Sequence, residues 1–340
     1  MKNTRIVGAT RIAMVILLAS AATLPCGAQM SSPHPSDMTI VKAESVGFSS
    51  ERLDRLHSLI QEEVDKKQLV GAVTILARHG KVVEYRTYGQ RDVASGSPMT
   101  KDAIFRDYSM TKPVTGVAMV ILYEQGKWLP SDPIAKYIPE FAQLKVFKGV
   151  GADGKMILVD PDHPPTMQEL MTHSAGFSYG SGHSVVDAMY QEKKPMQSAN
   201  LQDMINKLAT LPLNYQPGKG WTYSVSMDIE GYLVEKLSGQ PLPDFMRDHI
   251  FVPLDMKDAG FFVPEEKRSR FATNYREDPQ GQLVGTTSAS GSPDYAAQPT
   301  APSGGGAWSP RLRTIIASRK CSLMAANSET SASWPPPRLS

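Results

Sequence analysis

The chain has 340 residues, of which 41% are hydrophobic and 21% are charged. This composition is typical of a soluble globular enzyme and excludes a chain too polar to bury a core. The net charge of +2 comes from 36 basic and 34 acidic residues without a long basic run, which argues against a nucleic-acid partner.

The N-terminus has the pattern of a secretory signal. Lys2, Arg5 and Arg11 precede the apolar stretch IAMVILLASAATL, and small residues lead to a cleavage point after Ala28. The apolar stretch is shorter than the roughly 20 residues of a membrane-spanning helix. We therefore expect a cleaved signal peptide over 1–28, export to the periplasm or secretion, and no stable membrane span in the mature chain.

Cysteine usage adds one alternative to this expectation. The chain holds two cysteines, Cys26 and Cys321, so a mature protein would keep one and form no internal disulfide. Cys26 leaves open an N-terminus that is lipid-anchored instead, although Pro25 makes a poor recognition sequence. Residues 29–44 form a polar leader before the folded domain.

The patterns after the leader predict a mixed fold. Leucines at helical spacing behind a serine cap predict a helix over 49–64, and two β-rich runs around a His-Gly turn predict an antiparallel hairpin over 71–89. Continuous apolar character predicts a buried helix over 112–125. Capping and amphipathic patterns predict helices over 165–176, 200–213 and 226–239. This order predicts an α+β fold with an all-helical middle, and a Gly/Ser/Pro-rich loop or meander over 278–306.

The stretch YSMTKPVTG holds a serine and a lysine at the start of the buried helix. Ser109 and Lys112 are one turn apart, so both side chains project from the same helix face. The serine could simply cap the helix, but a lysine in the first turn opposes the helix dipole. An unprotonated lysine can instead take the serine proton and create a nucleophile. A bare S-x-x-K pattern arises by chance about once in a chain this long, so it needs support from elsewhere.

A second stretch, QPGKGWTYSVS, supplies a tyrosine in a loop just before a helix. A buried tyrosine usually packs in a core with its hydroxyl hydrogen-bonded. Close to Ser109 and Lys112, however, the phenol of Tyr223 could relay a proton to a leaving group. The two stretches together therefore predict nucleophilic catalysis.

Residues 45–306 resemble the serine hydrolases of the class C β-lactamase and penicillin-binding-protein fold, especially the family VIII carboxylesterases. The resemblance rests on YSMTKPVTG, LMTHSAGF, QPGKGWTYSVS and HIFVPLDMKDAGFFVP, and the S-x-x-K serine is the nucleophile in such enzymes. It implies a β-lactamase/transpeptidase-like fold in which Ser109 is acylated, Lys112 activates it and Tyr223 is the partner acid or base. It also implies that no cofactor or metal is required.

The resemblance bears on the substrate as well. Val225 stands at the third position of the Y-x-N motif of β-lactamases, and valine cannot hydrogen-bond a substrate amide. We therefore expect a small-molecule ester, with a β-lactam-like compound or a D-amino-acid peptide as the alternative substrate. His173 is expected to belong to a structural turn and not to the catalytic machinery.

The end of the chain departs from the family pattern. Residues 307–340 lack apolar periodicity and include three consecutive prolines, and the third family motif, K/H-T-G or W-G-G, has no match. We interpret 307–340 as an aberrant tail, with a shift of reading frame near Gly306 as the hypothesis that explains it. A domain that ends at residue 306 without its C-terminal strands leaves a further alternative, an inactive relative that only binds cell-wall peptides or esters.

Overall fold

The structure is a computed structural model that describes residues 39–286, 295 and 297–310. The chain divides into two units, Met1–His34 and Pro35–Ser340, and all described residues belong to the second. The expected signal peptide, both cysteines and the tail after residue 310 lie outside the described residues. Among the described helices, none has both the length and the apolar composition needed to cross a membrane.

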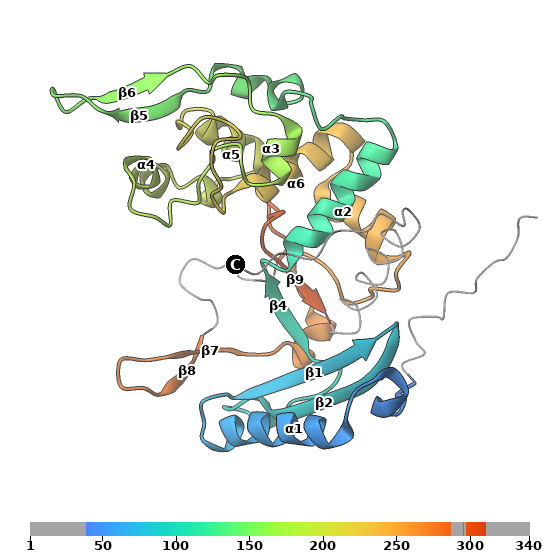
Figure 1. Ribbon diagram of the computed structural model, residues 1–340. Coiled ribbons are helices and arrows are strands. Elements are labelled where there is room, and N and C mark those ends of the chain that lie inside the picture. Colours follow the sequence, from blue (N-terminus) through green and yellow to red (C-terminus); the bar gives the residue numbers. More distant parts are fainter. Residues whose placement is uncertain (1–38, 287–294, 296, 311–340) are drawn as a thin grey trace, which may run out of the picture. The chain divides into compact units, whose positions relative to one another are not determined.

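A helix packed on an antiparallel sheet forms the first part of the described chain (Figure 1). The helix begins after Ser49, whose hydroxyl accepts the Arg52 N–H at 3.3 Å. His79 and Gly80 form the tight turn of the hairpin, with φ values of 51° and 72°. The helix and the hairpin predicted from the sequence are confirmed. The elements are α1 (Ser50–Asp65), β1 (Gly71–Arg78), β2 (Lys81–Asp92) and β3 (Ser97–Pro98), preceded by a 3-10 helix at Ala43–Val46.

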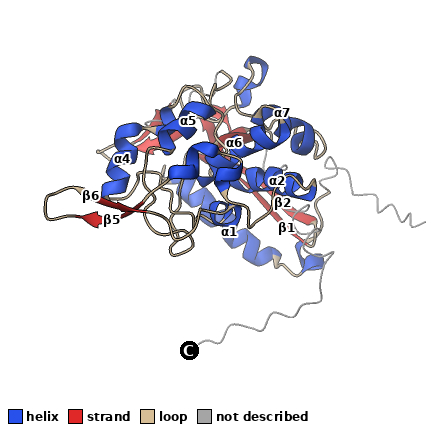
Figure 2. Ribbon diagram, turned by 90° about the horizontal axis from the view of Figure 1, so that it is seen from above, coloured by secondary structure: helices blue, strands red, loops and turns tan. Residues whose placement is uncertain are grey.

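The middle of the chain is helical, as predicted, but it also contains a β-hairpin that the sequence analysis missed. The hairpin, β5 (Val146–Val150) and β6 (Met156–Val159), projects from the helices (Figures 1 and 2). It is joined to the helical region through Phe147, whose N–H donates to the Leu213 carbonyl at 2.9 Å. The α-helices are α2 (Thr111–Glu124), α3 (Met167–Met171), α4 (Val185–Lys193), α5 (Leu201–Leu208), α6 (Ser226–Ser238) and α7 (Leu242–Met246). Shorter turns of helix lie at Ile134–Lys136, Pro139–Gln143, Pro195–Gln197, Arg247–Phe251 and Glu265–Arg270.

Two further strand pairs complete the described part. β4 (Ile104–Tyr108) leads directly to Ser109 and pairs antiparallel with β9 (Ala307–Pro310), so the first four residues of the segment interpreted as an aberrant tail form a strand. β7 (Asn274–Glu277) and β8 (Leu283–Thr286) form a hairpin, and β8 falls within the segment predicted to be a loop or meander.

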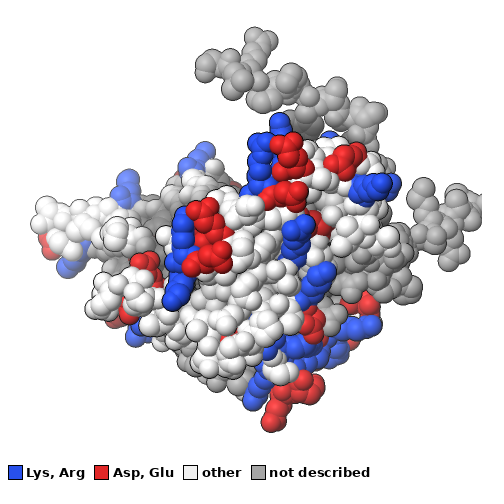
Figure 3. All heavy atoms as spheres, turned by 90° about the horizontal axis from the view of Figure 1, so that it is seen from below, with Lys and Arg blue, Asp and Glu red and all other residues white. Residues whose placement is uncertain are grey.

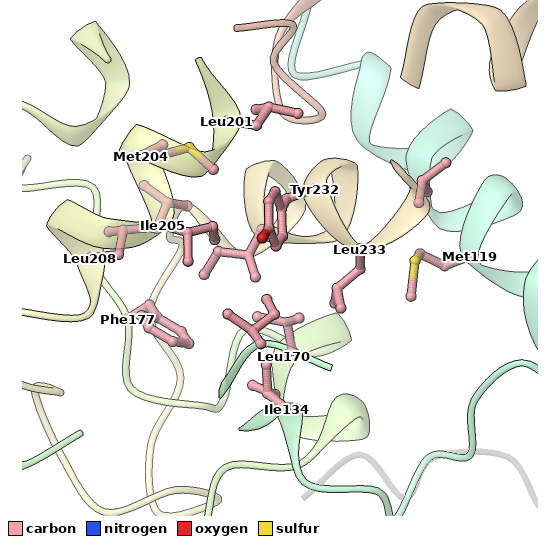
Figure 4. Close-up of a cluster of buried hydrophobic side chains, with 14 of the residues drawn as sticks. Met119, Ile134, Leu170, Phe177, Leu201, Met204, Ile205, Leu208, Tyr232 and Leu233 are labelled. Carbon is pink, nitrogen blue, oxygen red and sulfur yellow. The ribbon is translucent and has the colours of Figure 1, made fainter. Parts of the chain in front are cut away.

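The main hydrophobic core surrounds α6 (Figure 4). Leu233 of α6, Met119 of α2, Leu170 of α3 and Ile205 of α5 are all fully buried. Full burial of one such side chain contributes about 2 kcal/mol to folding, and the set therefore fixes α2 and α6 against each other. On the face of the molecule drawn in Figure 3, basic and acidic side chains lie next to each other among uncharged residues.

Candidate active site

Ser109 lies in the turn between β4 and α2. Tyr108, the residue before it, has a φ of 43°, a left-handed conformation that is unusual for an aromatic residue. The N-cap of α2 is Met110, and it makes no side-chain capping hydrogen bond. The hydroxyl of Ser109 is therefore not used as a helix cap and is free to face the groups around it.

Lys112 and Tyr223 converge on the hydroxyl of Ser109. The Tyr223 hydroxyl donates to the Ser109 Oγ at 2.7 Å, and the Lys112 Nζ lies 3.3 Å from the same atom. Lys112 is buried, whereas Ser109 and Tyr223 are exposed to solvent. The structure thus brings together the three residues that the sequence analysis selected, which are 114 residues apart at most. Two donors on one oxygen stabilise the negative charge that Ser109 acquires on losing its proton.

His173 supports the loop that carries Tyr223. Its carbonyl accepts the Thr222 N–H at 3.0 Å, and its Nδ1 accepts the Ser224 N–H at 3.2 Å. The ring centroids of His173 and Tyr223 are 5.2 Å apart. Burial, together with the charge of Lys112, lowers the pKa of His173. A neutral His173 that accepts a backbone hydrogen bond fits the structural role expected from the sequence.

Lys112 is held by contacts on several sides. Its Nζ donates to the Gly305 carbonyl at 2.8 Å, and it lies 4.6 Å from the ring centroid of Tyr223 and 5.4 Å from that of Tyr179. When the amine is protonated, it is attracted to the π electrons of these aromatic faces. The amine is therefore restrained beside Ser109.

Asp228 connects the loop at residues 303–305 to helix α6. This carboxylate is fully buried in the first turn of α6, where it accepts hydrogen bonds from the Gly305 N–H at 3.1 Å, from the Tyr179 hydroxyl at 2.9 Å and from the Ser303 hydroxyl. Burial raises the pKa of Asp228, and the three donors and the charge of Lys112 act in the opposite direction. Burial also raises the pKa of Tyr179, which therefore stays a neutral donor.

The glycines of the SGGG stretch allow this loop to lie directly on α6. A Cβ added at Gly304 would lie inside the van der Waals distance of the Met227 carbonyl oxygen, and one at Gly305 would lie 2.6 Å from the Tyr179 hydroxyl. Glycine is the residue that permits such a close approach of two backbones. The sequence analysis assigned this stretch to a loop only, although a run of three glycines is a signal of a close backbone contact.

Val225 does not join these residues. It is fully buried in the hydrophobic core, next to the N-terminus of α6, and is not among the residues that line the pocket around Ser109. The structure therefore brings Ser109, Lys112 and Tyr223 together and leaves Val225 in the hydrophobic core. Tyr179, Asp228, Ser303 and Gly305 are the residues of the site that the sequence analysis did not identify.

A pocket of about 660 Å³ opens at Ser109. Lys112 and Asp228 are the charged residues of its described lining, and each is already engaged, with Gly305 and with the donors described above. The remaining walls are mostly apolar. They include Pro195, Met196, Leu201, Met204, Phe261 and Tyr295. No group of three or more His, Cys, Asp or Glu side chains in the described part of the chain is arranged to hold a metal ion.

Comparisons with known proteins agree with this fold. The family model described as Beta-lactamase matches residues 56–312. Protein Rv1367c of Mycobacterium tuberculosis (strain ATCC 25618 / H37Rv) is 34% identical over 262 residues, which cover 76% of this chain and 63% of the relative. Esterase EstB of Burkholderia gladioli is 33% identical over 248 residues, which cover 71% of this chain and 59% of the relative. The chain thus spans about 60% of the length of these curated relatives.

The similarity extends to solved structures. EstCE1, described as a hydrolase with promiscuous acyltransferase activity, matches with a TM-score of 0.65 at 24% identity, covering 78% of this chain and 71% of that protein. Fold and comparisons define a β-lactamase/transpeptidase-like protein, which confirms the α+β fold class expected from the sequence. The chain belongs to the Beta-lactamase family, and the resemblance drawn from its motifs is confirmed.

Proposed function

We propose that this chain is an exported serine hydrolase that cleaves carboxylic esters through an acyl-enzyme on Ser109. The observation that carries the proposal is the convergence of the Tyr223 hydroxyl, at 2.7 Å, and the Lys112 Nζ, at 3.3 Å, on the Ser109 Oγ. This is the arrangement of a nucleophile next to groups that can take its proton. The esterase relative EstB supports the choice of reaction.

The reaction follows from this geometry. The Ser109 Oγ attacks the ester carbonyl carbon while its proton passes to the Lys112 and Tyr223 pair, 3.3 Å and 2.7 Å away. The bond from the carbonyl carbon to the alcohol oxygen then breaks, and the Tyr223 hydroxyl protonates that oxygen. Water attacks the acyl-enzyme, the acid leaves, and the proton of the water returns to Ser109.

The described lining of the pocket favours an uncharged ester over a β-lactam. A β-lactam or a D-amino-acid peptide carries a carboxylate, which needs a cationic or hydrogen-bonding partner when it leaves water. Lys112 is the cation of the described lining, and its Nζ is bonded to Gly305 and Ser109. A carboxylate would therefore have to rely on neutral hydroxyl groups of the lining, such as those of Ser198 and Thr300. The apolar walls formed by residues such as Met204 and Phe261 suit an aliphatic or aromatic group instead.

Ester hydrolysis by matched variants tests the proposal. With p-nitrophenyl butyrate as substrate, Ser109→Ala should lose at least about a thousandfold in kcat, and Tyr223→Phe about a hundredfold or more. The control is Ser58→Ala, since the Ser58 hydroxyl lies on α1, outside the described lining of the pocket, and donates to the Asp54 carbonyl at 3.0 Å. Full ester turnover by Ser109→Ala would overturn the proposal. Faster turnover of nitrocefin than of the ester would favour the β-lactamase alternative.

A further inference from the structure

Two buried carboxyl groups lie two residues apart on α6 in opposite surroundings. Asp228 and Glu230 are both fully buried. Asp228 accepts three hydrogen bonds, whereas neither carboxyl oxygen of Glu230 has a hydrogen-bond partner among the described residues. Burying a carboxylate lowers the stability of the fold unless hydrogen-bond donors surround it. The donors gathered at Asp228 therefore mark it as the carboxylate that this region is built around.

Two of the three residues that donate to Asp228 also contact the amine of Lys112. The Gly305 peptide bridges the two, because its N–H donates to Asp228 at 3.1 Å and its carbonyl accepts from the Lys112 Nζ at 2.8 Å. Tyr179 donates its hydroxyl to Asp228 at 2.9 Å, and its ring centroid lies 5.4 Å from the Lys112 Nζ. A displacement of either group would change the position of the amine relative to Ser109.

We infer that Asp228 is a positioning residue that holds Gly305 and Tyr179 around Lys112 and thereby fixes the amine beside Ser109. The inference deepens the proposed function and rests on it. When Lys112 takes the serine proton, its positive charge and the carboxylate of Asp228 attract each other in a buried setting. The ionisable groups that face Asp228 are Lys112, Tyr179 and Glu230.

Replacement of Asp228 by the isosteric amide tests this role. Asp228→Asn should lower kcat for p-nitrophenyl butyrate about 10- to 100-fold and change KM less than about twofold, because a displaced catalytic group affects the chemical step. The acidic limb of the kcat/KM profile should move to lower pH, since the amine of Lys112 loses a neighbouring negative charge. A role in stability alone would reduce the folded fraction and leave the pH profile in place.

The neighbouring carboxyl provides the matched control. Burial and the charge of Asp228 raise the pKa of Glu230 to about 8, so it is neutral at pH 6 to 7, where Glu230→Gln mimics it. That variant should keep kcat and the acidic limb unchanged between these pH values. Equal loss of activity in Asp228→Asn and Glu230→Gln would overturn the inference.

Two additional measurements keep the test decisive. If Asp228→Asn does not fold, Ser303→Ala can replace it, because it removes one donor and keeps the carboxylate. This variant should lower kcat several-fold and move the acidic limb of the kcat/KM profile to lower pH by less than Asp228→Asn. Acetylation of Lys112 by acetic anhydride, followed by peptide mass spectrometry, requires no ester turnover. If the wild-type protein has no esterase activity but the pH dependence of Lys112 labelling is still shifted to lower pH in Asp228→Asn, the proposed function is refuted and the positioning role is kept. Unshifted labelling would refute the positioning role.

Discussion

The helical region and helix α1 differ in how completely they bury their apolar side chains. In the helical region, Leu233, Met119 and Leu170 have no exposed surface. In α1, by contrast, His57 is the buried residue, and Leu59 keeps 55% of its surface exposed. Side chains without free space have fixed positions, whereas half-exposed ones tolerate change. Because its side chains are tightly packed, the helical region can hold catalytic groups in fixed positions.

The site is attached mainly to that tightly packed region. Lys112 belongs to α2, Asp228 to α6, and the loop at 303–305 lies on α6 through Gly304. Ser109 enters from β4, at the edge of the same region. Four predictions test the contrast, in order of decreasing effect.

The largest effect is expected from a cavity in the helical core. Leu233→Ala should lower the free energy of unfolding by about 3 kcal/mol or more. The substitution removes buried apolar surface and leaves a cavity that the tightly packed neighbouring side chains cannot fill. Leu59→Ala on α1 should change it by less than about 0.5 kcal/mol. Urea unfolding of the purified variants measures both values. Equal losses at the two positions would remove the contrast between the regions.

The next effect concerns the contact between the loop and α6. Gly304→Ala should lower kcat about a hundredfold, because the new Cβ would collide with the Met227 carbonyl oxygen and lift the Gly305 carbonyl away from Lys112. Steady-state kinetics with p-nitrophenyl butyrate measure the loss. Wild-type kcat in a folded Gly304→Ala protein would show that this contact does not position the amine.

A third prediction uses the unpartnered carboxyl of the helical core. The folded chain holds the Glu230 pKa at about 8, against a usual value of 4.5, so between these values the native state keeps a proton that the unfolded chain releases. Stability must then fall as pH rises, by about 1.4 kcal/mol per unit. From pH 5 to pH 6.5, wild type should lose about 2 kcal/mol relative to Glu230→Gln in urea unfolding. If the difference in free energy of unfolding between wild type and Glu230→Gln is the same at both pH values, burial of the carboxyl is contradicted. Any cost of burying the amide in the variant does not depend on pH and therefore cancels in this comparison.

The smallest effect on stability is expected at Gly116 of α2, where the helical region leaves space for an added methyl group. A Cβ at Gly116 of α2 meets nothing within 4 Å, unlike one at Gly304. Gly116→Ala should therefore stabilise the helix by about 0.5 to 1 kcal/mol and raise the melting temperature by about 2 °C, without changing kcat. A thermal melt and the same ester assay test this. A loss of activity here would mean that Gly304→Ala is not acting through its collision.

Local patterns predicted much of this structure, and long-range contacts account for what they missed. The Thr166 capping box and the left-handed Gly239 at the end of α6 both follow from short-range rules and are present. The β5–β6 hairpin was missed because its position depends on Leu213, more than fifty residues further along the chain. Strand pairing of this kind is decided by tertiary contacts that local propensity does not contain.

The same distinction applies to the site. Ser109 and Lys112 are one helical turn apart, so their spacing alone indicated the pair. Asp228 resembles an ordinary acidic residue in the first turn of a helix. Its donors come from distant parts of the chain, Tyr179 on one side and Ser303 and Gly305 on the other, the last of them 77 residues later. Val225 was selected by its position in a motif, and its burial depends on packing that the motif does not describe.

Covalent labelling of the active serine tests the central claim most directly. A fluorophosphonate reacts with a serine hydroxyl only when neighbouring groups activate it. After incubation of the folded protein with such a probe, intact mass spectrometry and peptide mapping should find one adduct, on Ser109, that Ser109→Ala abolishes and Ser58→Ala retains. An unlabelled wild-type protein, or an adduct that persists in Ser109→Ala, would contradict the account.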